Sequence, residues 1–275
     1  MDIATQTDRA AERLTAALVA SGLNLSGVAS AAAWDARMPP ARRTDALLPG
    51  ARSILVFGNG GGALWDALLA DLRRDPRGLT EEEHPVDAFV RRAVAAADPL
   101  LGTVRRRWFW ASAEADLHID FRVLAGMAGM GVQSRLGLLI DPTWGTWIGL
   151  RAACFLEADL PESAPASVDP CDGCPAPCVS ACVGAAFPKG TWDVDACSRF
   201  HREDDLCQRT CASRLACPVG VERRYTPEHY GYHTHRVSGR AWLREHLGLA
   251  PGADRFEGIG PHWGDWRARV DVKGA

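Results

Sequence analysis

Apolar and polar residues follow one another along the chain with spacings that predict both helices and strands. Over residues 8–22 the apolar residues recur every three or four positions, which places them on one face of a helix that Gly22 is positioned to end. A second helix is predicted over residues 85–97, because proline is favourable in a first helical turn. Short apolar runs that predict strands lie at residues 54–58, 107–111, 136–140 and 147–156. This mixture indicates an α+β or α/β domain.

A segment rich in proline and small polar residues divides the chain at residues 160–170. We therefore expect three parts. They are a cofactor-binding α+β domain at residues 1–160, a cysteine-rich module at residues 161–220, and a C-terminal tail at residues 221–275 that packs on both.

The overall composition is that of an ordinary folded protein of 275 residues, with 47% hydrophobic and 24% charged residues. It excludes global disorder, and a formal charge of −3 gives no reason to expect wholesale nucleic-acid binding. We find neither a run of roughly 18 apolar residues, which a membrane span needs, nor the basic and apolar start of a signal peptide. The expected location is the cytoplasm, with no membrane partner.

Nine cysteines are many for such a composition, and eight of them lie between Cys171 and Cys217. A reducing cytoplasm argues against structural disulfides there and favours metal or iron–sulfur ligation. The ninth, Cys154, lies in an apolar stretch, so we expect it to be a small buried hydrophobic side chain.

The cysteine spacing is close to that of iron–sulfur proteins. In two-cluster ferredoxins the run C-x2-C-x2-C-x3-C-P wraps a cubane, and its fourth cysteine binds the other cluster. Here the first set has a middle spacing of three residues and Val183 in place of proline, and the second has spacings of three and five after Cys207. Two sets of four favour two [4Fe–4S] clusters, with the ligands Cys171, Cys174, Cys178, Cys182, Cys197, Cys207, Cys211 and Cys217. A single cluster, zinc, and a degenerate module with free thiols or disulfides are the alternatives.

Several segments resemble epoxyqueuosine reductase and occur in the same order. AGMGVQSRLGLLIDPTWGTW at residues 128–147 is similar to a stretch of that family reading approximately AGLGWIGKNTLLIHPEYGSW. CVSACVGAAF at residues 178–187 is similar to the family's C-I-D-A-C-P-T-G-A-I, and Cys197 stands where the family has its next cysteine. Residues 48–56 resemble its first core strand.

Residues 84–94 and 140–151 also resemble cobalamin-processing proteins of the CblC type, which lack the cysteine module. Together the resemblances imply an α+β, nitroreductase-like domain that holds cobalamin or a related corrinoid, followed by a ferredoxin-like module that supplies electrons. The implied protein is a corrinoid-dependent oxidoreductase. Its partners would be a small-molecule substrate or corrinoid and an external electron donor such as ferredoxin or flavodoxin. A non-catalytic cobalamin-handling or electron-carrier protein and a zinc-stabilised binding module are the alternatives.

The resemblance also suggests roles for particular residues. If the ligand exchange of two-cluster ferredoxins holds, Cys217 completes the first cluster and Cys182 the second. Asp120 is the nearest candidate for the family's catalytic aspartate, a proton donor, although a loop or salt-bridged aspartate is the alternative because no proline follows it. Near-neutral charge and the lack of helical-repeat signals argue against tRNA as a partner. The residues expected to contact the corrinoid are Gly58, Gly60, Ser134, Arg135, Trp144, Gly145 and Trp147.

Two features depart from this pattern or stand outside it. Ser134 and Arg135 replace the family's Gly-Lys pair, and Asp141 replaces a histidine. A histidine cluster, H-x3-H-x-H, lies in the tail, where one helix would bring its first two members to the same face. Metal ligation, contact with substrate or cofactor, and a surface or capping role are the alternatives for His229, His233 and His235.

Overall fold

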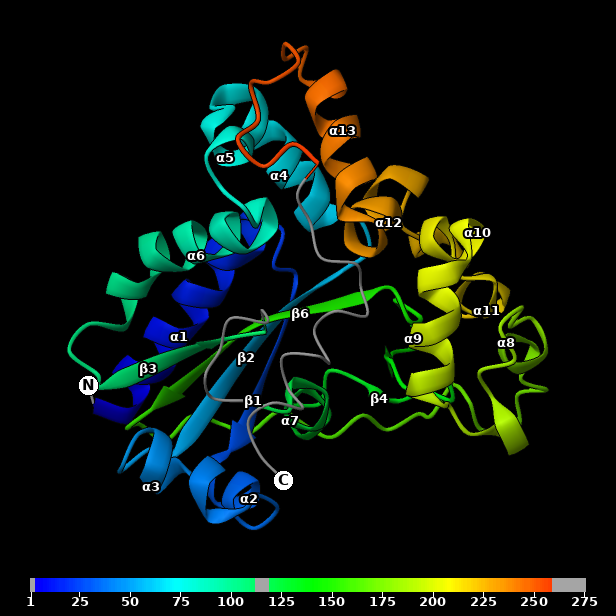
Figure 1. The fold of residues 1–275 in the computed structure, drawn as a ribbon. Coiled ribbons are helices and arrows are strands. Elements are labelled where there is room, and N and C mark those ends of the chain that lie inside the picture. The colour runs from blue at the N-terminus through cyan, green and yellow to red at the C-terminus, as the bar shows by residue number, and fades with distance from the viewer. Residues whose placement is uncertain (1–2, 112–118, 259–275) are drawn as a thin grey trace.

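The computed structural model, which describes residues 3–111 and 119–258, is built around one four-stranded antiparallel sheet (Figure 1). The strands lie in the order β1-β2-β6-β3, so the two central strands come from distant parts of the chain. Their bounds are β1 Leu25–Ser30, β2 Ser53–Gly60, β3 Arg106–Trp110 and β6 Ile148–Leu156. A separate antiparallel pair joins β4 (Val132–Gln133) to β5 (Leu139–Ile140).

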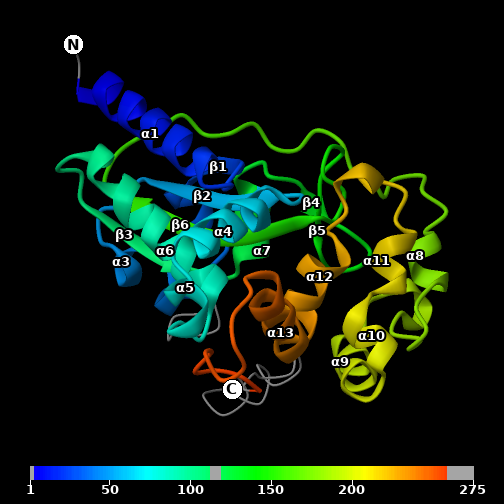
Figure 2. The same ribbon diagram turned by 90° about the horizontal axis from the view of Figure 1, so that it is seen from above.

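Helices cover both faces of the large sheet (Figures 1 and 2). One face carries α1 (Ile3–Ala20), α4 (Ala63–Arg74) and α6 (Pro85–Ala97), with the short α5 (Arg77–Thr80) beside them. The opposite face carries α2 (Ala31–Asp35), α3 (Thr44–Leu47) and α7 (Phe121–Met127). Two 3₁₀ helices, η1 (Pro40–Arg42) and η2 (Asp98–Leu101), complete this part.

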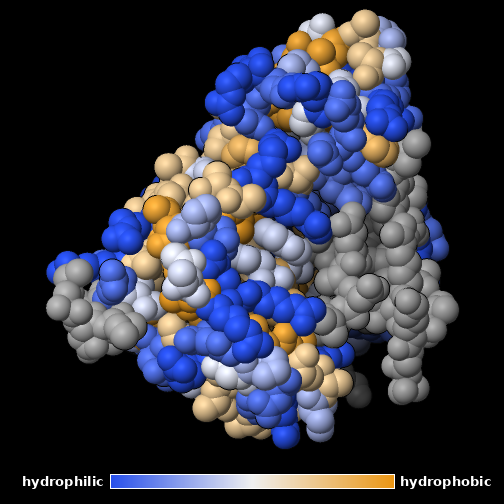
Figure 3. Space-filling model, turned by 90° about the vertical axis from the view of Figure 1, so that its left-hand side faces the viewer, coloured by the Kyte–Doolittle hydropathy of each residue, from blue (hydrophilic) through white to orange (hydrophobic). Residues whose placement is uncertain are grey.

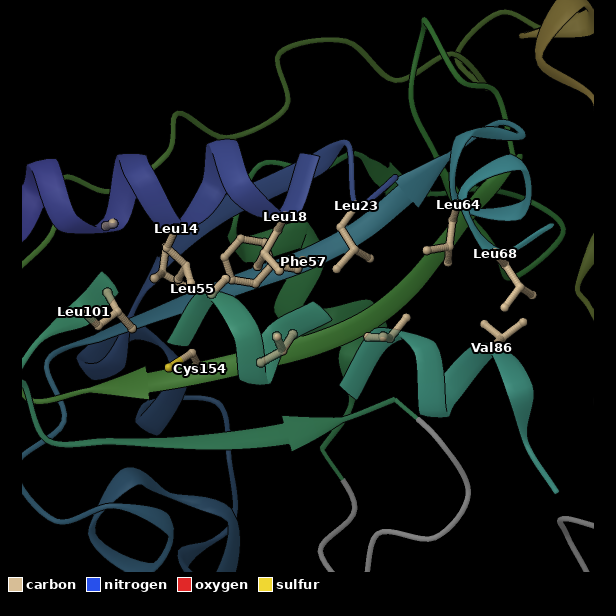
Figure 4. Close-up of a cluster of buried hydrophobic side chains, with 14 of the residues drawn as sticks. Leu14, Leu18, Leu23, Leu55, Phe57, Leu64, Leu68, Val86, Leu101 and Cys154 are labelled. Carbon is tan, nitrogen blue, oxygen red and sulfur yellow. The ribbon is translucent and has the colours of Figure 1, made fainter. Parts of the chain in front are cut away.

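The alternation of side chains along the central strands produces two cores. Leu55, Phe57 and Cys154 point to one face, where they meet the leucines of α1 and α4 (Figure 4). Ile54 and Phe155, their neighbours in sequence, point to the other face. Because successive side chains of a strand lie on opposite faces, such runs stay buried throughout only where both faces are covered.

The cysteine module lies beyond the β4–β5 pair and consists of short helices. They are α8 (Pro177–Ser180), α9 (Val194–Glu203), α10 (Asp205–Arg209) and α11 (Ala212–Ala216), with the 3₁₀ helices η3 (Pro188–Gly190) and η4 (Val221–Arg223). The proline-rich segment before the module runs beside β1, where Ser163 and Val28 exchange two hydrogen bonds, of 2.9 and 3.0 Å.

The tail returns to the first domain as α12 (Pro227–Thr234) and α13 (Arg236–His246), which lie between α4 and the cysteine module (Figure 2). Tyr232 and Leu243 belong to the same buried cluster as α1 and α4. The tail is therefore part of the main core.

The elements agree in large part with the sequence predictions, and the α+β class is confirmed. The helix predicted at 85–97 has those bounds, and the helix predicted at 8–22 is α1, with Gly22 just beyond its end at φ +82°. The run at 136–140 is wrong as a whole strand, because only Leu139–Ile140 pairs and Gly137 at φ +70° turns the chain before it. The strand predicted at 54–58 is longer than expected, because β2 extends through Gly60.

The face of the molecule shown in Figure 3 is mostly hydrophilic. On the face shown in Figure 3, hydrophobic residues occur in small groups among hydrophilic ones. Among the helices of the described residues, none has the length and apolar character needed to cross a bilayer.

Candidate functional site

Four of the predicted ligands gather where α8 packs against α11. Cys171 and Cys174 lie in a turn, Cys178 lies in α8, and Cys217 follows the last residue of α11. Burial raises the pKa of Cys178, and the neighbouring thiols of Cys217, Cys171 and Cys174 raise it further. Burial also raises the pKa of Cys217, with Cys171 and Cys174 adding to the effect. Such charge interactions fall off with distance, so these four thiols form one group, the first thiol set.

The other four form a second thiol set. Cys182 follows α8, Cys197 lies in α9, Cys207 lies in α10, and Cys211 precedes α11. Burial, followed by Cys211, Cys197, Asp204 and Cys182, raises the pKa of Cys207 to about 12. Burial raises the pKa of Cys197 too, and Cys211 and Cys182 raise it further.

The thiol sets do not simply follow chain order, in which the first four cysteines would form one set and the last four the other. Cys217 joins the first three cysteines, and Cys182 joins the last three. This is the exchange found in two-cluster ferredoxins. The role of the eight residues as ligands stays a prediction.

Several sulfur atoms accept hydrogen bonds from nearby N–H groups. The backbone N–H of Ala186 donates to Cys182 Sγ, and that of Arg214 donates to Cys211 Sγ, each at 3.4 Å. A hydrogen bond from Trp192 lowers the pKa of Cys197 against the larger rise that burial causes. Hydrogen bonds of this kind stabilise thiolates and tune the potential of a bound cluster.

The thiols are not arranged for a single ion. All nine cysteines are free of disulfides. Within residues 3–111 and 119–258, no group of three or more His, Cys, Asp or Glu side chains could hold one metal ion.

The turn at residues 141–147 joins the sheet domain to the cysteine module. Gly145 has φ +57°, and a Cβ placed there would lie 2.1 Å from the carbonyl oxygen of Val219. The ring of Trp144 covers Gly60, where an added Cβ would lie 2.3 Å from it. Only glycine permits these close approaches, so the turn is a packed contact between the two parts.

Comparison with solved structures identifies the architecture. A selenomethionine-labelled epoxyqueuosine reductase matches with a TM-score of 0.57 and 14% identity, over 80% of this chain and 68% of that one. The Bacillus subtilis epoxyqueuosine reductase matches at a TM-score of 0.55 with the same identity and coverage. This chain shares the fold of epoxyqueuosine reductase. No protein-family model and no curated protein matches it.

A second fold relative is the C. elegans B12-trafficking protein CblC, at a TM-score of 0.53 and 13% identity. The match covers 89% of this chain and 98% of that one. The predicted resemblance to the epoxyqueuosine reductase and CblC scaffolds is therefore confirmed as a likeness of fold.

The residues expected to contact a corrinoid are mostly enclosed by protein. Gly58 is buried in β2, where an added Cβ would lie 2.6 Å from the carbonyl oxygen of Gly149, and Trp147 is only 1% exposed. Ser134 is buried, whereas Arg135 is exposed. One cavity of the molecule is lined by Trp110, Leu150 and Arg151, and another by residues around Ser30 and Glu162. Neither is lined by any of the seven predicted contacts.

Asp120 caps the N-terminus of α7. Its Oδ1 accepts hydrogen bonds from the backbone N–H groups of Arg122 at 3.1 Å and Val123 at 3.2 Å. This is the local role of an N-cap aspartate. Its predicted role as proton donor stays a prediction.

The tail histidines are part of the packing between the two parts. His229 stacks between Trp65, at 4.9 Å between ring centroids, and Tyr225, at 3.8 Å. Burial, aided by nearby arginines, lowers the pKa of His229 to about 3 and holds that of His233 well below its usual value. His235 caps α13 through Nδ1. No described group containing these histidines could hold a metal ion, so metal ligation is not supported for them.

Proposed function

We propose that this chain is an iron–sulfur redox protein whose cysteine module is ferredoxin-like and holds two [4Fe–4S] clusters. The first thiol set would hold one cluster and the second thiol set the other. The grouping of the thiols supports this most directly, because each set of four is drawn from segments far apart in sequence. Four thiolates per cluster is the usual ligand number.

The donor set of each group, four cysteines, fits a [4Fe–4S] cluster, and zinc is the alternative that the same residue type allows. In a cubane each iron takes one thiolate, so the four thiols stand apart around the cluster. A structural zinc ion takes four thiolates at about 2.3 Å from one centre, so the metal and sulfide content of the protein distinguishes the two.

Bound clusters would supply one-electron transfer. The chain's own residues would keep that chemistry close to the sheet domain. Gly145 packs on Val219, close to Cys217 of the first thiol set, and Tyr230 lies near the second thiol set and on the ring of Trp147, just before β6. The proposed partners are an external electron donor and a small-molecule substrate.

A corrinoid-dependent reductase is the second candidate function, favoured by the shared fold with epoxyqueuosine reductase and with a B12-trafficking protein. The enclosed state of Gly58, Gly60, Gly145 and Trp147 does not fit a corrinoid at those positions. We therefore derive no reaction step through that cofactor. A titration of the purified protein with cob(II)alamin tests this candidate, since a saturable spectral change would favour it and none would favour an electron carrier.

Paired cysteine variants test the proposal. After anaerobic reconstitution, Cys174→Ala and Cys197→Ala should each lose about half of the bound iron, because each removes a ligand from a different set. Cys154→Ala is the matched control, since Cys154 is fully buried in the main core and belongs to neither set, and it should keep all the iron. Loss of all iron in either single variant would argue for one shared cluster. Stoichiometric zinc without iron would favour a zinc-stabilised binding module.

A further inference from the structure

The second cysteine run departs from the ferredoxin spacing at one point that has a structural consequence. Five residues separate Cys211 from Cys217, where the usual run has three. These five residues, Ala212–Ala216, form the whole of α11. The helix connects the two thiol sets, since Cys211 at its start belongs to the second and Cys217 at its end to the first.

Arg214, in the middle of α11, connects the second thiol set to the sheet domain. Its backbone N–H donates to Cys211 Sγ at 3.4 Å, and its guanidinium Nη2 donates to the carbonyl oxygen of Thr146 at 2.6 Å. The guanidinium also lies 4.3 Å from the ring centroid of Trp147 and 5.0 Å from that of Tyr225. One residue thus contacts a predicted ligand and the turn before β6.

The charge of Arg214 has no carboxylate partner among the described residues. Its Nε is buried and makes no hydrogen bond within that part of the chain. The neighbouring His229 offers no counter-charge, since burial lowers its pKa and Arg151 and Arg214 lower it further. A half-buried cation without a counter-charge is unfavourable.

We infer that Arg214 is a positioning residue whose counter-charge is the cluster of the second thiol set, and that it raises the midpoint potential of that cluster. This rests on the proposed function. A [4Fe–4S] cluster with four thiolates carries net negative charge, so it would offset the guanidinium, and nearby positive charge favours the reduced state. The enlarged spacing is then explained, because it builds the helix that carries Arg214.

Redox titration monitored by electron paramagnetic resonance tests this inference. The signal that persists in Cys174→Ala belongs to the second set. In Arg214→Gln that signal should move to a more negative potential, while the first cluster stays unchanged. Arg214→Lys keeps the charge and should recover most of the wild-type potential. The matched control is Arg209→Gln, which removes an exposed charge between Cys207 and Cys211 and should shift neither cluster measurably.

The outcomes separate the two proposals. Absence of iron in the wild-type protein would overturn the proposed function itself. Two loaded clusters with the same potentials in Arg214→Gln as in Arg209→Gln would overturn the role of Arg214 alone. If Arg214→Gln fails to load its second cluster, loading in Arg214→Lys would support the charge requirement, whereas equal failure in both variants would contradict it.

Discussion

At the scale of single residues, the contact between the two parts depends on side chains that stay neutral although cations surround them. His229 is the clearest case, because it is 2% exposed and stacked between two aromatic rings, with Arg151 and Arg214 nearby. Protonation there would place another charge among arginines. The packing of this contact therefore depends on pH.

His229 should make folding less stable at acidic pH. Burial lowers its pKa to about 3 from 6.5, so below pH 6.5 the unfolded chain takes up a proton that the folded chain does not. Stability is then fully present above pH 6.5 and falls as the pH drops towards about 3. Between pH 7 and pH 5 the wild type should lose about 2 kcal/mol more than His229→Phe, which keeps a stacked ring but does not titrate. Urea unfolding at both pH values measures this, and parallel losses in the two proteins would contradict it.

Glycine conformation at the turn gives a second prediction at this scale. Gly145 and Gly248, which ends α13 as a left-handed cap, have similar φ angles of +57° and +65°, but an added Cβ meets Val219 at Gly145 and open space at Gly248. Gly248→Ala should cost about 1–2 kcal/mol, the usual penalty of a left-handed residue. Gly145→Ala should cost at least about 2 kcal/mol more, because the backbone of the module has to move. Thermal unfolding compares the two, and equal costs would show that the turn does not hold the module.

At the scale of elements, helix α13 is fixed to the first domain by a buried ion pair. Arg240 is 1% exposed, pairs with Asp254, and donates to the carbonyl oxygens of Leu79, Glu82 and Glu83. Every direction of its guanidinium fork is occupied. The pair connects the tail to the segment between α5 and α6.

Breaking this pair should destabilise the protein strongly. Arg240→Met leaves the buried Asp254 with only its longer, 3.5 Å contact to Arg244, and we expect a loss of roughly 3 kcal/mol in the free energy of unfolding. Arg52→Met is the control, because the Arg52–Asp159 pair is solvent-exposed and should contribute less than about 1 kcal/mol. Denaturant midpoints measure both variants. A similar small effect in each would mean that the tail is held by apolar packing alone.

Local elements were predictable from sequence where the signal was local. Proline at the first turn predicted the start of α6. Continuous apolar runs predicted the two central strands, because a strand whose two faces are both covered by helices buries every side chain. The length of β5 was not predictable, since Gly137 turns the chain against Trp192 of the cysteine module, a contact distant in sequence. The burial of Gly60 likewise depends on a residue distant in sequence, because the ring of Trp144 covers it.

At the scale of the whole molecule, the candidate site also combines features that the local sequence predicts with features that depend on contacts distant in sequence. The eight cysteines and their division into runs could be read from spacing, and the exchange of Cys182 and Cys217 followed only from a resemblance. Arg214 was missed, because its role depends on Thr146 and Trp147, which tertiary folding brings to it. The five-residue spacing between Cys211 and Cys217 was the signal that could have pointed to it.

The central claim is that a module with two iron–sulfur clusters lies beside a sheet domain with the epoxyqueuosine reductase fold. The most direct test is the metal and sulfide content of protein purified and reconstituted without oxygen. Two [4Fe–4S] clusters predict about eight iron and about eight acid-labile sulfide per chain, with no stoichiometric zinc. One or two zinc ions per chain without labile sulfide would contradict the account.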